Sequence, residues 1–193
     1  MQRLDPQLVG RYGEPDPFEF ADGGRTAGNN FAGMILHIIA QQISTKVALV
    51  IYDRVVAAVG GPLTPAGILA LDVDQLRALG TSHSKATYLR ALAEAVSSSD
   101  LDIEGLGQLG DAEAITELTR VKGIGPWSAQ MFLIHQLKRE DILPAGDLGI
   151  RTAVQRAYDL TQLPDSAEVT EWGAIWAPHR SYAAALLWRS LRD

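Results

Sequence analysis

The 193-residue sequence predicts an all-α fold, and three observations support this prediction. Apolar residues recur at helical spacing through most of the chain, as between Val47 and Val59. Asn, Ser, Thr and Asp, the residues that typically cap helices, precede these runs. No segment shows the alternation of apolar and polar residues that a half-buried strand requires.

The capping residues place the helices in order along the chain. In the first half of the chain, helices are predicted over residues 6–12, from a cap at Asn29 or Asn30 to residue 42, and from a cap at Ser44 to residue 59. Short helices follow Thr64 and Asp72, and a longer helix runs from Ser82 or Ser84 to residue 96. In the second half, helices are predicted from Asp111 to residue 120, over residues 126–138, from Asp147 to residue 159, and after Pro178. Residues 101–110 are a glycine-spaced connection. Each capping side chain can accept a hydrogen bond from a backbone N–H that the first helical turn leaves unpaired.

The composition excludes several classes of protein and site. With no cysteine, the chain has no disulfide, iron–sulfur cluster or thiolate zinc site. Its four histidines, at positions 37, 83, 135 and 179, lack the paired spacing of metal ligands. The N-terminus has no apolar signal-peptide core, and the longest apolar segment, residues 31–40, is too short to span a bilayer. We therefore expect a cytoplasmic protein with no membrane association.

The most informative segment is residues 118–129, Leu-Thr-Arg-Val-Lys-Gly-Ile-Gly-Pro-Trp-Ser-Ala. Gly123 and Gly125 flank one apolar residue, and Pro126 suits the first position of a helix. The pattern predicts two helices joined by a tight hairpin, residues 122–125, whose backbone N–H groups can hold a phosphate. An ordinary glycine turn between packed helices is the alternative.

Charge supports a nucleic-acid partner locally but not overall. The chain carries a net charge of −6. Between residues 118 and 158, however, six basic residues (Arg120, Lys122, Lys138, Arg139, Arg151 and Arg156) outnumber three acidic ones (Glu140, Asp141 and Asp147). The hairpin is therefore in a locally basic segment of an acidic chain.

Asp147 and two tryptophans are the remaining candidates for chemistry. Asp147 follows a glycine and precedes an amphipathic run, so it is a typical helix N-cap. An ionised carboxylate there could also stabilise a cationic sugar or orient water. Trp127 and Trp188 could fill the core, or could stack on a flipped, cationic base.

These residues resemble the helix-hairpin-helix (HhH-GPD) DNA glycosylase superfamily, and within it the AlkA-type 3-methyladenine DNA glycosylase II. The resemblance covers residues 31–192. It includes residues 118–129 and 146–149, together with residues 38–46, 84–89 and the run from Arg180 to Trp188. It implies two helical lobes with a central DNA- and base-binding cleft. One lobe would be residues 30–139, and the other residues 1–29 plus 140–193.

The resemblance also assigns roles to individual residues of this sequence. Asp147 matches the catalytic aspartate, and Trp127, Met131 and Trp188 match positions around the base pocket. Gln42 falls where relatives insert a wedge, the residue that fills the gap left by the flipped nucleotide. The implied DNA-binding residues are Gln42, Lys122, Gly123, Ile124, Gly125 and Ser128. The backbone carbonyls of Thr119, Val121 and Gly123 match a site for Na⁺ or K⁺, and no other cofactor is expected.

Three departures from the family pattern bear on substrate range, and Trp127 bears on mechanism. The chain is too short for the extra N-terminal domain of the AlkA type, and Gln42 and Met131 replace residues that are leucine and aromatic in some relatives. Trp127 stands where bifunctional members carry the lysine that forms a Schiff base. We therefore expect base excision without strand cleavage.

The sequence thus predicts a monomeric, monofunctional N-glycosylase that removes alkylated purines from double-stranded DNA. A glycosylase for deaminated, oxidised or mismatched bases is the alternative on the same scaffold. A non-catalytic helix-hairpin-helix module that binds DNA or a repair partner is the alternative from another class. A plain helical interaction protein would leave the combination of the hairpin and Asp147 unexplained.

Overall fold

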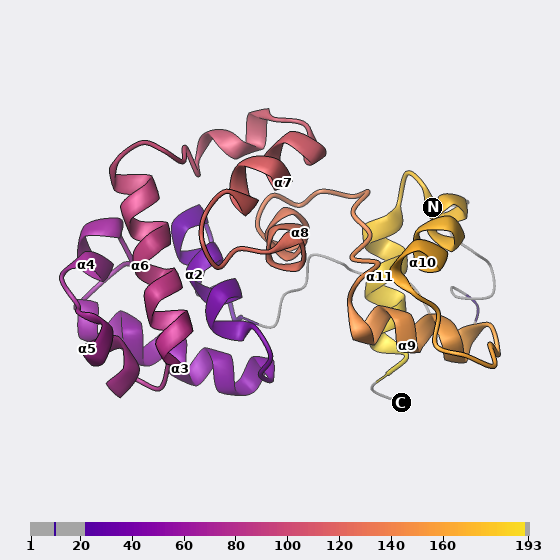
Figure 1. The fold of residues 1–193 in the computed structure, drawn as a ribbon, viewed down its shortest axis with the longest axis horizontal. Coiled ribbons are helices and arrows are strands. Elements are labelled where there is room, and N and C mark those ends of the chain that lie inside the picture. Colours follow the sequence, from indigo (N-terminus) through magenta and orange to yellow (C-terminus); the bar gives the residue numbers. More distant parts are fainter. Residues whose placement is uncertain (1–9, 11–21, 192–193) are drawn as a thin grey trace. The chain divides into compact units, whose positions relative to one another are not determined.

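The computed structural model describes residue 10 and residues 22–191, and all regular secondary structure in these residues is helical (Figure 1). The all-α prediction is therefore confirmed for this part of the chain. The predicted helix over residues 6–12 lies outside the described residues, except for Gly10, which is helical. The chain divides into two compact units, Ala21–Phe132 and Leu133–Asp193 with Met1–Phe20. The lobe limits of 30–139 and 140–193 remain a prediction.

The larger unit is built around helix α2 (Asn30–Ala40), which is buried from Phe31 to Ile39. Helices α3 (Thr45–Val59) and α6 (His83–Ser97) pack against α2, and the short helices α4 (Pro65–Leu69) and α5 (Val73–Ala78) pack against α6. A 3₁₀ turn, η1 (Gly105–Gln108), lies in the predicted glycine-spaced connection and leads to α7 (Asp111–Thr119). Packing removes apolar side chains such as Ile51 and Val55 of α3 from water, which is the main source of stability, although Val47 and Val50 of α3 remain about half exposed.

Most predicted caps of this unit are confirmed. The side chains of Asn29, Ser44, Thr64, Asp72 and Ser82 each accept a hydrogen bond from a backbone N–H of the first helical turn. Asp111 is an exception, because it is the first residue of α7 and Gly110 occupies the cap position. The side chain of Glu113 accepts the Gly110 N–H at 3.0 Å, so a carboxylate from within the helix completes this end.

Helix α8 (Pro126–His135) starts at the predicted proline and ends three residues before the predicted Lys138. Lys138 has a left-handed backbone, with φ of 57°, which no helix can continue. The division between the two compact units falls inside this helix, between Phe132 and Leu133.

The smaller unit contains α9 (Leu148–Ala157), α10 (Ser166–Trp172), the 3₁₀ turn η2 (Gly173–Trp176) and α11 (Arg180–Arg189). Its core surrounds Trp176, which is fully buried with Ile150, Val154, Val169 and Leu187. The sequence did not predict α10, although Asp165 and Glu168 form a complete capping box at its start. At seven residues, α10 is too short to show a clear apolar period.

The start of α11 holds the segment that leads from α8 to α9. Arg180 makes two hydrogen bonds of 2.7 Å to the carboxylate of Asp141. The buried hydroxyl of Ser181 donates to the Arg139 carbonyl at 2.7 Å and accepts the Ile142 N–H at 3.0 Å. The Arg180-Ser181 pair of the sequence pattern is therefore a clamp on residues 139–142.

The clamp predicts how stability depends on pH. The Arg180 guanidinium lowers the pKa of Asp141 below its ordinary value of 3.8, so the ionised carboxylate stabilises the fold above that value. This stabilisation is lost as the pH falls from 3.8 through the lower pKa of the folded state. Asp141→Asn should cost roughly 1 kcal/mol at pH 7, with the difference from wild type shrinking below about pH 4. Urea unfolding between pH 3 and pH 7 measures this.

Asp53→Asn is the matched control for this clamp. Asp53 makes the same two-point contact with Arg25, at 2.7 and 3.0 Å, but its side chain is 52% exposed against 29% for Asp141. Solvent screening should make the Asp53 effect smaller. If Asp141→Asn lowers the free energy of unfolding by the same amount at every pH, the substitution acts through packing and not through the charge of the carboxylate.

None of the helices in residues 22–191 combines the length and the apolar character needed to cross a bilayer.

Candidate active site

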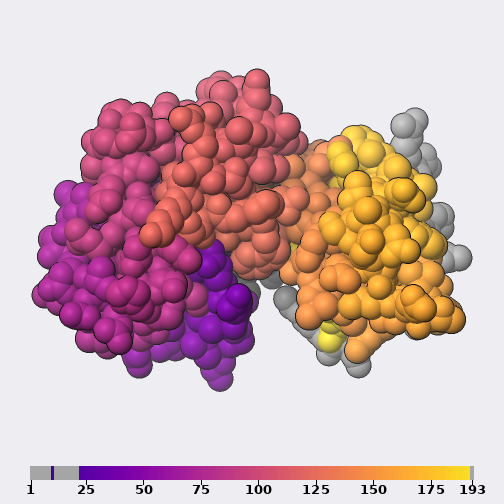
Figure 2. Space-filling model, in the orientation of Figure 1, coloured from indigo at the N-terminus to yellow at the C-terminus, as the bar shows by residue number. Residues whose placement is uncertain are grey.

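The hairpin of the larger unit follows α7 directly and ends where α8 begins. The Val121 N–H bonds the Leu118 carbonyl and the Ile124 N–H bonds the Val121 carbonyl, both at 3.1 Å, which closes two successive tight turns. The atoms of the α7–α8 region reach the surface of this unit, where they are coloured salmon in Figure 2. The first turn of α8 comes next in the chain, and the partial positive charge of a helix N-terminus favours a phosphate there.

The two hairpin glycines are needed for different reasons. Gly123 has φ of 93°, a left-handed conformation, and a Cβ at this position would overlap the ring of Tyr88 on α6. Gly125 does not use positive φ, and a Cβ there would meet nothing within 4 Å. Internal packing therefore explains Gly123 alone. The open space over Gly125 leaves room for a group from outside the protein to approach the backbone.

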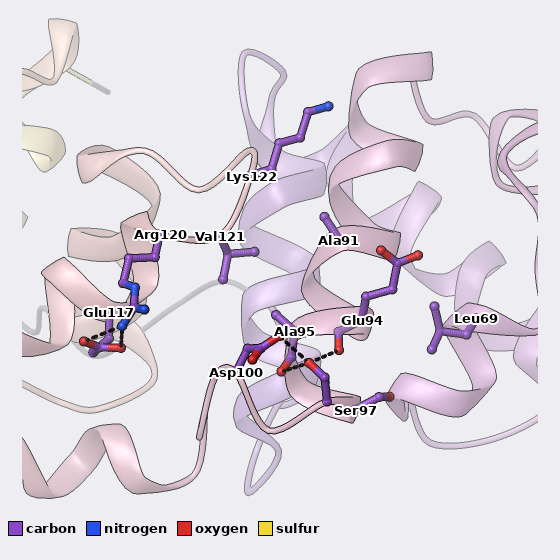
Figure 3. Close-up of a pocket in the computed structure, with 11 residues that line it drawn as sticks. Leu69, Ala91, Glu94, Ala95, Ser97, Asp100, Glu117, Arg120, Val121 and Lys122 are labelled. Carbon is purple, nitrogen blue, oxygen red and sulfur yellow. Dashed lines mark hydrogen bonds and ion pairs between the residues drawn. The ribbon is translucent and has the colours of Figure 1, made fainter.

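The hairpin carries less free positive charge than the sequence suggested. Arg120 pairs with Glu117 at 2.9 Å, and Figure 3 shows its side chain directed at that carboxylate. Lys122 is exposed and extends away from the neighbouring side chains in the same view. Lys122 is therefore the basic side chain that the hairpin exposes to solvent, while Arg120 is paired with Glu117.

A groove of about 750 Å³ lies beside the hairpin in the larger unit (Figure 3). It is bounded by the C-terminal end of α6 and by residues 117–122, and Glu94, Asp100 and Glu117 make it partly acidic. Lys122 and Val121 line it, but Trp127 and Met131 do not. This groove is therefore distinct from the predicted base pocket.

Gln42 occupies an unusual backbone conformation between α2 and α3. The φ values of Gln41 and Gln42, −52° and 59°, and a hydrogen bond of 3.3 Å from the Ile43 N–H to the Ala40 carbonyl match a type II β-turn. Glycine is preferred at the second central position of a type II turn, which Gln42 occupies here. A residue other than glycine at that position costs roughly 1 kcal/mol of conformational free energy. The exposed side chain of Gln42 is kept despite this cost, which supports a functional role.

The α8 residues predicted to touch base or DNA have different exposures. Trp127 is partly exposed, whereas Met131 is 5% exposed and Ser128 only 2%. The Ser128 hydroxyl accepts a hydrogen bond of 2.9 Å from the Gln41 side chain. Its oxygen thus supports the turn that carries Gln42, and contacts of Trp127, Met131 and Ser128 with DNA remain predictions.

Asp147 is the N-cap of α9 in the smaller unit, so its predicted capping role is confirmed. Its Oδ1 accepts the Ile150 N–H at 2.9 Å and also the indole N–H of Trp188 at 3.0 Å. The carboxylate is partly exposed and held from two directions, by its own helix and by α11.

The contact between Asp147 and Trp188 depends on a third residue, Gly149, which the sequence pattern of residues 146–149 included without assigning it a role. A Cβ at Gly149 would lie 2.9 Å from Asp147 Oδ1 and 3.5 Å from Trp188 Cδ1. Glycine at this position therefore allows the indole and the carboxylate to approach each other. The sequence signal was the glycine two residues after Asp147, in a helical turn where alanine is intrinsically more favourable.

The comparison with protein families decides the identity of this arrangement. The model of the HhH-GPD superfamily of base excision DNA repair proteins matches residues 35–178, which include both the hairpin and Asp147. The chain belongs to the HhH-GPD superfamily.

Individual relatives agree with this assignment. DNA-3-methyladenine glycosylase 1 of Schizosaccharomyces pombe is 35% identical over 160 residues, which cover 81% of this chain and 70% of the relative. A DNA-3-methyladenine glycosylase of Saccharomyces cerevisiae is 43% identical over 122 residues, 58% of this chain and 41% of that protein. The chain therefore spans less than half of the second relative.

A solved structure of the same kind matches the fold. The S. pombe 3-methyladenine DNA glycosylase in complex with abasic DNA superposes with a TM-score of 0.79 at 31% identity, covering 97% of this chain and 89% of that one. That HhH-GPD protein was therefore determined with DNA bound.

The HhH-GPD hairpin also fits the cation site that the resemblance implied. Carbonyl oxygens are hard ligands of the kind such ions take. The Val121 and Gly123 carbonyls each accept one hydrogen bond, from the Ile124 N–H and from Gln41 Nε2 respectively. Because a carbonyl oxygen has two lone pairs, each retains one for a metal ion. Within residues 22–191, histidine and carboxylate side chains form no group of three or more that could hold a metal ion.

Proposed function

We propose that this protein is a monofunctional DNA N-glycosylase that excises alkylated purines such as 3-methyladenine from double-stranded DNA in base excision repair. The observation that carries the proposal is Asp147, a carboxylate fixed at the start of α9 by the Ile150 N–H and the Trp188 indole. The matching relatives are named as DNA-3-methyladenine glycosylases, which supports the substrate class.

In the proposed reaction the hairpin binds the DNA backbone and the target nucleotide leaves the stack. The contacts with DNA would come from the backbone of Gly123, Ile124 and Gly125 in the hairpin, from Ser128 in the first turn of α8 and from the Lys122 ammonium. Gln42 would fill the gap left by the flipped nucleotide. Na⁺ or K⁺ held by the carbonyls of Thr119, Val121 and Gly123 would add positive charge beside the phosphate. Trp127, Met131 and Trp188 would contact the base.

The chemical step breaks the bond between the sugar C1′ and the purine nitrogen. The bonding electrons leave with the base, which is cationic when alkylated and departs as a neutral molecule. The developing oxocarbenium charge on the sugar is stabilised by ionised Asp147. Water then adds to C1′ and loses a proton. Trp127 at the Schiff-base position supports hydrolysis without strand cleavage.

The test is mass analysis of the bases that the purified protein releases from duplex DNA treated with a methylating agent. We expect release of 3-methyladenine without strand breaks, and none from the Asp147→Asn variant. Release of deaminated or oxidised bases from duplexes that carry those lesions, without release of 3-methyladenine, would assign the protein to the other glycosylase class. Salt-dependent DNA binding without release from any lesion would make it a non-catalytic module.

A further inference from the structure

We propose that Gln41 is a positioning residue that attaches the Gln42 turn, residues 40–43, to the hairpin. The residue that fills the gap and the backbone that binds phosphate would then act as one rigid element. This inference rests on the proposed function, and it assigns a role to the residue adjacent to the expected wedge.

The Gln41 side chain uses both of its N–H groups on the hairpin region. Its Nε2 donates to the Gly123 carbonyl and to the Ser128 hydroxyl, each at 2.9 Å, although these partners are 82 and 87 residues away in sequence. A carbonyl can only accept, so the amide nitrogen must face Gly123. The bonds therefore join three segments, the end of α2, the hairpin and the first turn of α8.

The end of α2 that precedes this turn is also anchored. The Lys85 ammonium, on α6, donates to the Ile39 carbonyl at 2.7 Å, within the last turn of α2. A cation at this position satisfies a carbonyl that the helix end leaves without an N–H partner. Burial lowers the pKa of Lys85, consistent with an ammonium inserted between helices. The turn is therefore fixed by the Gln41 side chain from within it, and the helix end before it is fixed by Lys85 from α6.

Anchoring of this kind explains how an exposed glutamine is kept at φ of 59°. A strained residue persists only where its surroundings fix the conformation. Gln42 lies next to Gln41, so a Gln41 side chain fixed on Gly123 determines where the Gln42 side chain leaves the turn. Pre-organisation removes the need to order the wedge when DNA binds.

A double-mutant cycle tests the coupling between the two glutamines. Single-turnover release of 3-methyladenine is measured for Gln41→Ala, Gln42→Ala and the double variant. We expect each single change to reduce the rate about tenfold, and the double variant to be no slower than Gln42→Ala alone, because Gln41 acts through Gln42. Two losses that multiply in the double variant would overturn the inference.

A second readout reports insertion without catalysis. The fluorescence of 2-aminopurine opposite a tetrahydrofuran abasic-site analogue should change when wild-type protein inserts Gln42, and should change much less with Gln41→Ala. Equal signals from wild type and Gln41→Ala would overturn the inference.

If Gln41→Ala does not fold, as judged by thermal melting, Ser128→Ala replaces it in the double-mutant cycle, because this change removes one of the two acceptors of the Gln41 side chain. We expect a loss of a few fold that vanishes in the Gln42→Ala background, and a loss that persists there would overturn the inference.

The outcomes separate this inference from the proposed function. Wild-type protein that releases no base from any lesion would refute the glycosylase proposal. Wild-type activity that survives unchanged in Gln41→Ala would refute the positioning role alone and leave the function standing.

Discussion

Replacing Asp147 by Asn should reduce the release of alkylated bases by at least about a hundredfold while barely changing the stability of the protein. The loss follows from removing a negative charge that stabilises a cationic transition state, an effect of roughly 3 kcal/mol in comparable sites. Stability is maintained because Asn caps helices about as well as Asp. The amide oxygen can still accept the Ile150 N–H and the Trp188 indole N–H. Single-turnover rates and thermal melting measure the two effects.

Two further variants separate charge from capping. Asp147→Ala removes both, so it should lose activity as Asn does and also about 1 kcal/mol of stability. Asp165→Asn is the matched control, because Asp165 caps α10 in the same unit by accepting the Ala167 and Glu168 N–H groups. It should leave both activity and stability unchanged. Full activity of Asp147→Asn would show that the carboxylate charge takes no part in the reaction.

The parts of the fold that sequence predicted are those with local physical causes. A cap such as Ser44 or Asp147 bonds an N–H three residues away, so the cause and the effect lie in one short segment. The end of α3 at Gly60 is equally local, because that residue adopts the left-handed conformation that glycine allows. Gly123 belongs to the same class through its positive φ, and these elements were placed correctly.

What the sequence did not provide depends on contacts between distant residues. Nothing near Trp188 indicates that its indole donates to a carboxylate 41 residues earlier. The bonds from Gln41 to Gly123 and Ser128 are equally remote in sequence. The count of basic and acidic residues treated Arg120 as an unpaired positive charge, whereas in the structure it pairs with Glu117. For α10 the signal was present, since Asp165 and Glu168 have capping-box spacing, but the apolar run was too short to suggest a helix.

Gly149 provides the other large expected effect, since its substitution by Ala should change activity and stability differently. Alanine is about 1 kcal/mol better than glycine in a helix, which offsets some or all of the crowding it creates, so the melting temperature should move little. Its Cβ would be 2.9 Å from Asp147 Oδ1 and 3.4 Å from Leu191 Cδ1, so the carboxylate must shift by a few tenths of an ångström. We expect base release to fall by roughly ten- to a hundredfold, because misplacing a catalytic group has effects of this size.

Two variants show whether this loss arises at the carboxylate. Trp188→Phe keeps an aromatic ring and adds no Cβ but removes the indole N–H, so it should share the activity loss if holding Asp147 is what matters. Gly61→Ala is the matched control, because a Cβ at Gly61 meets nothing within 4 Å and the residue does not have positive φ. Its activity should equal that of wild type. Full activity in both Gly149→Ala and Trp188→Phe would mean that the position of the Asp147 carboxylate is not limiting. Loss in Gly149→Ala alone would point to crowding around α11. Loss in both variants, with the affinity of Trp188→Phe for lesion DNA unchanged, ties the rate to the hydrogen bond that holds Asp147.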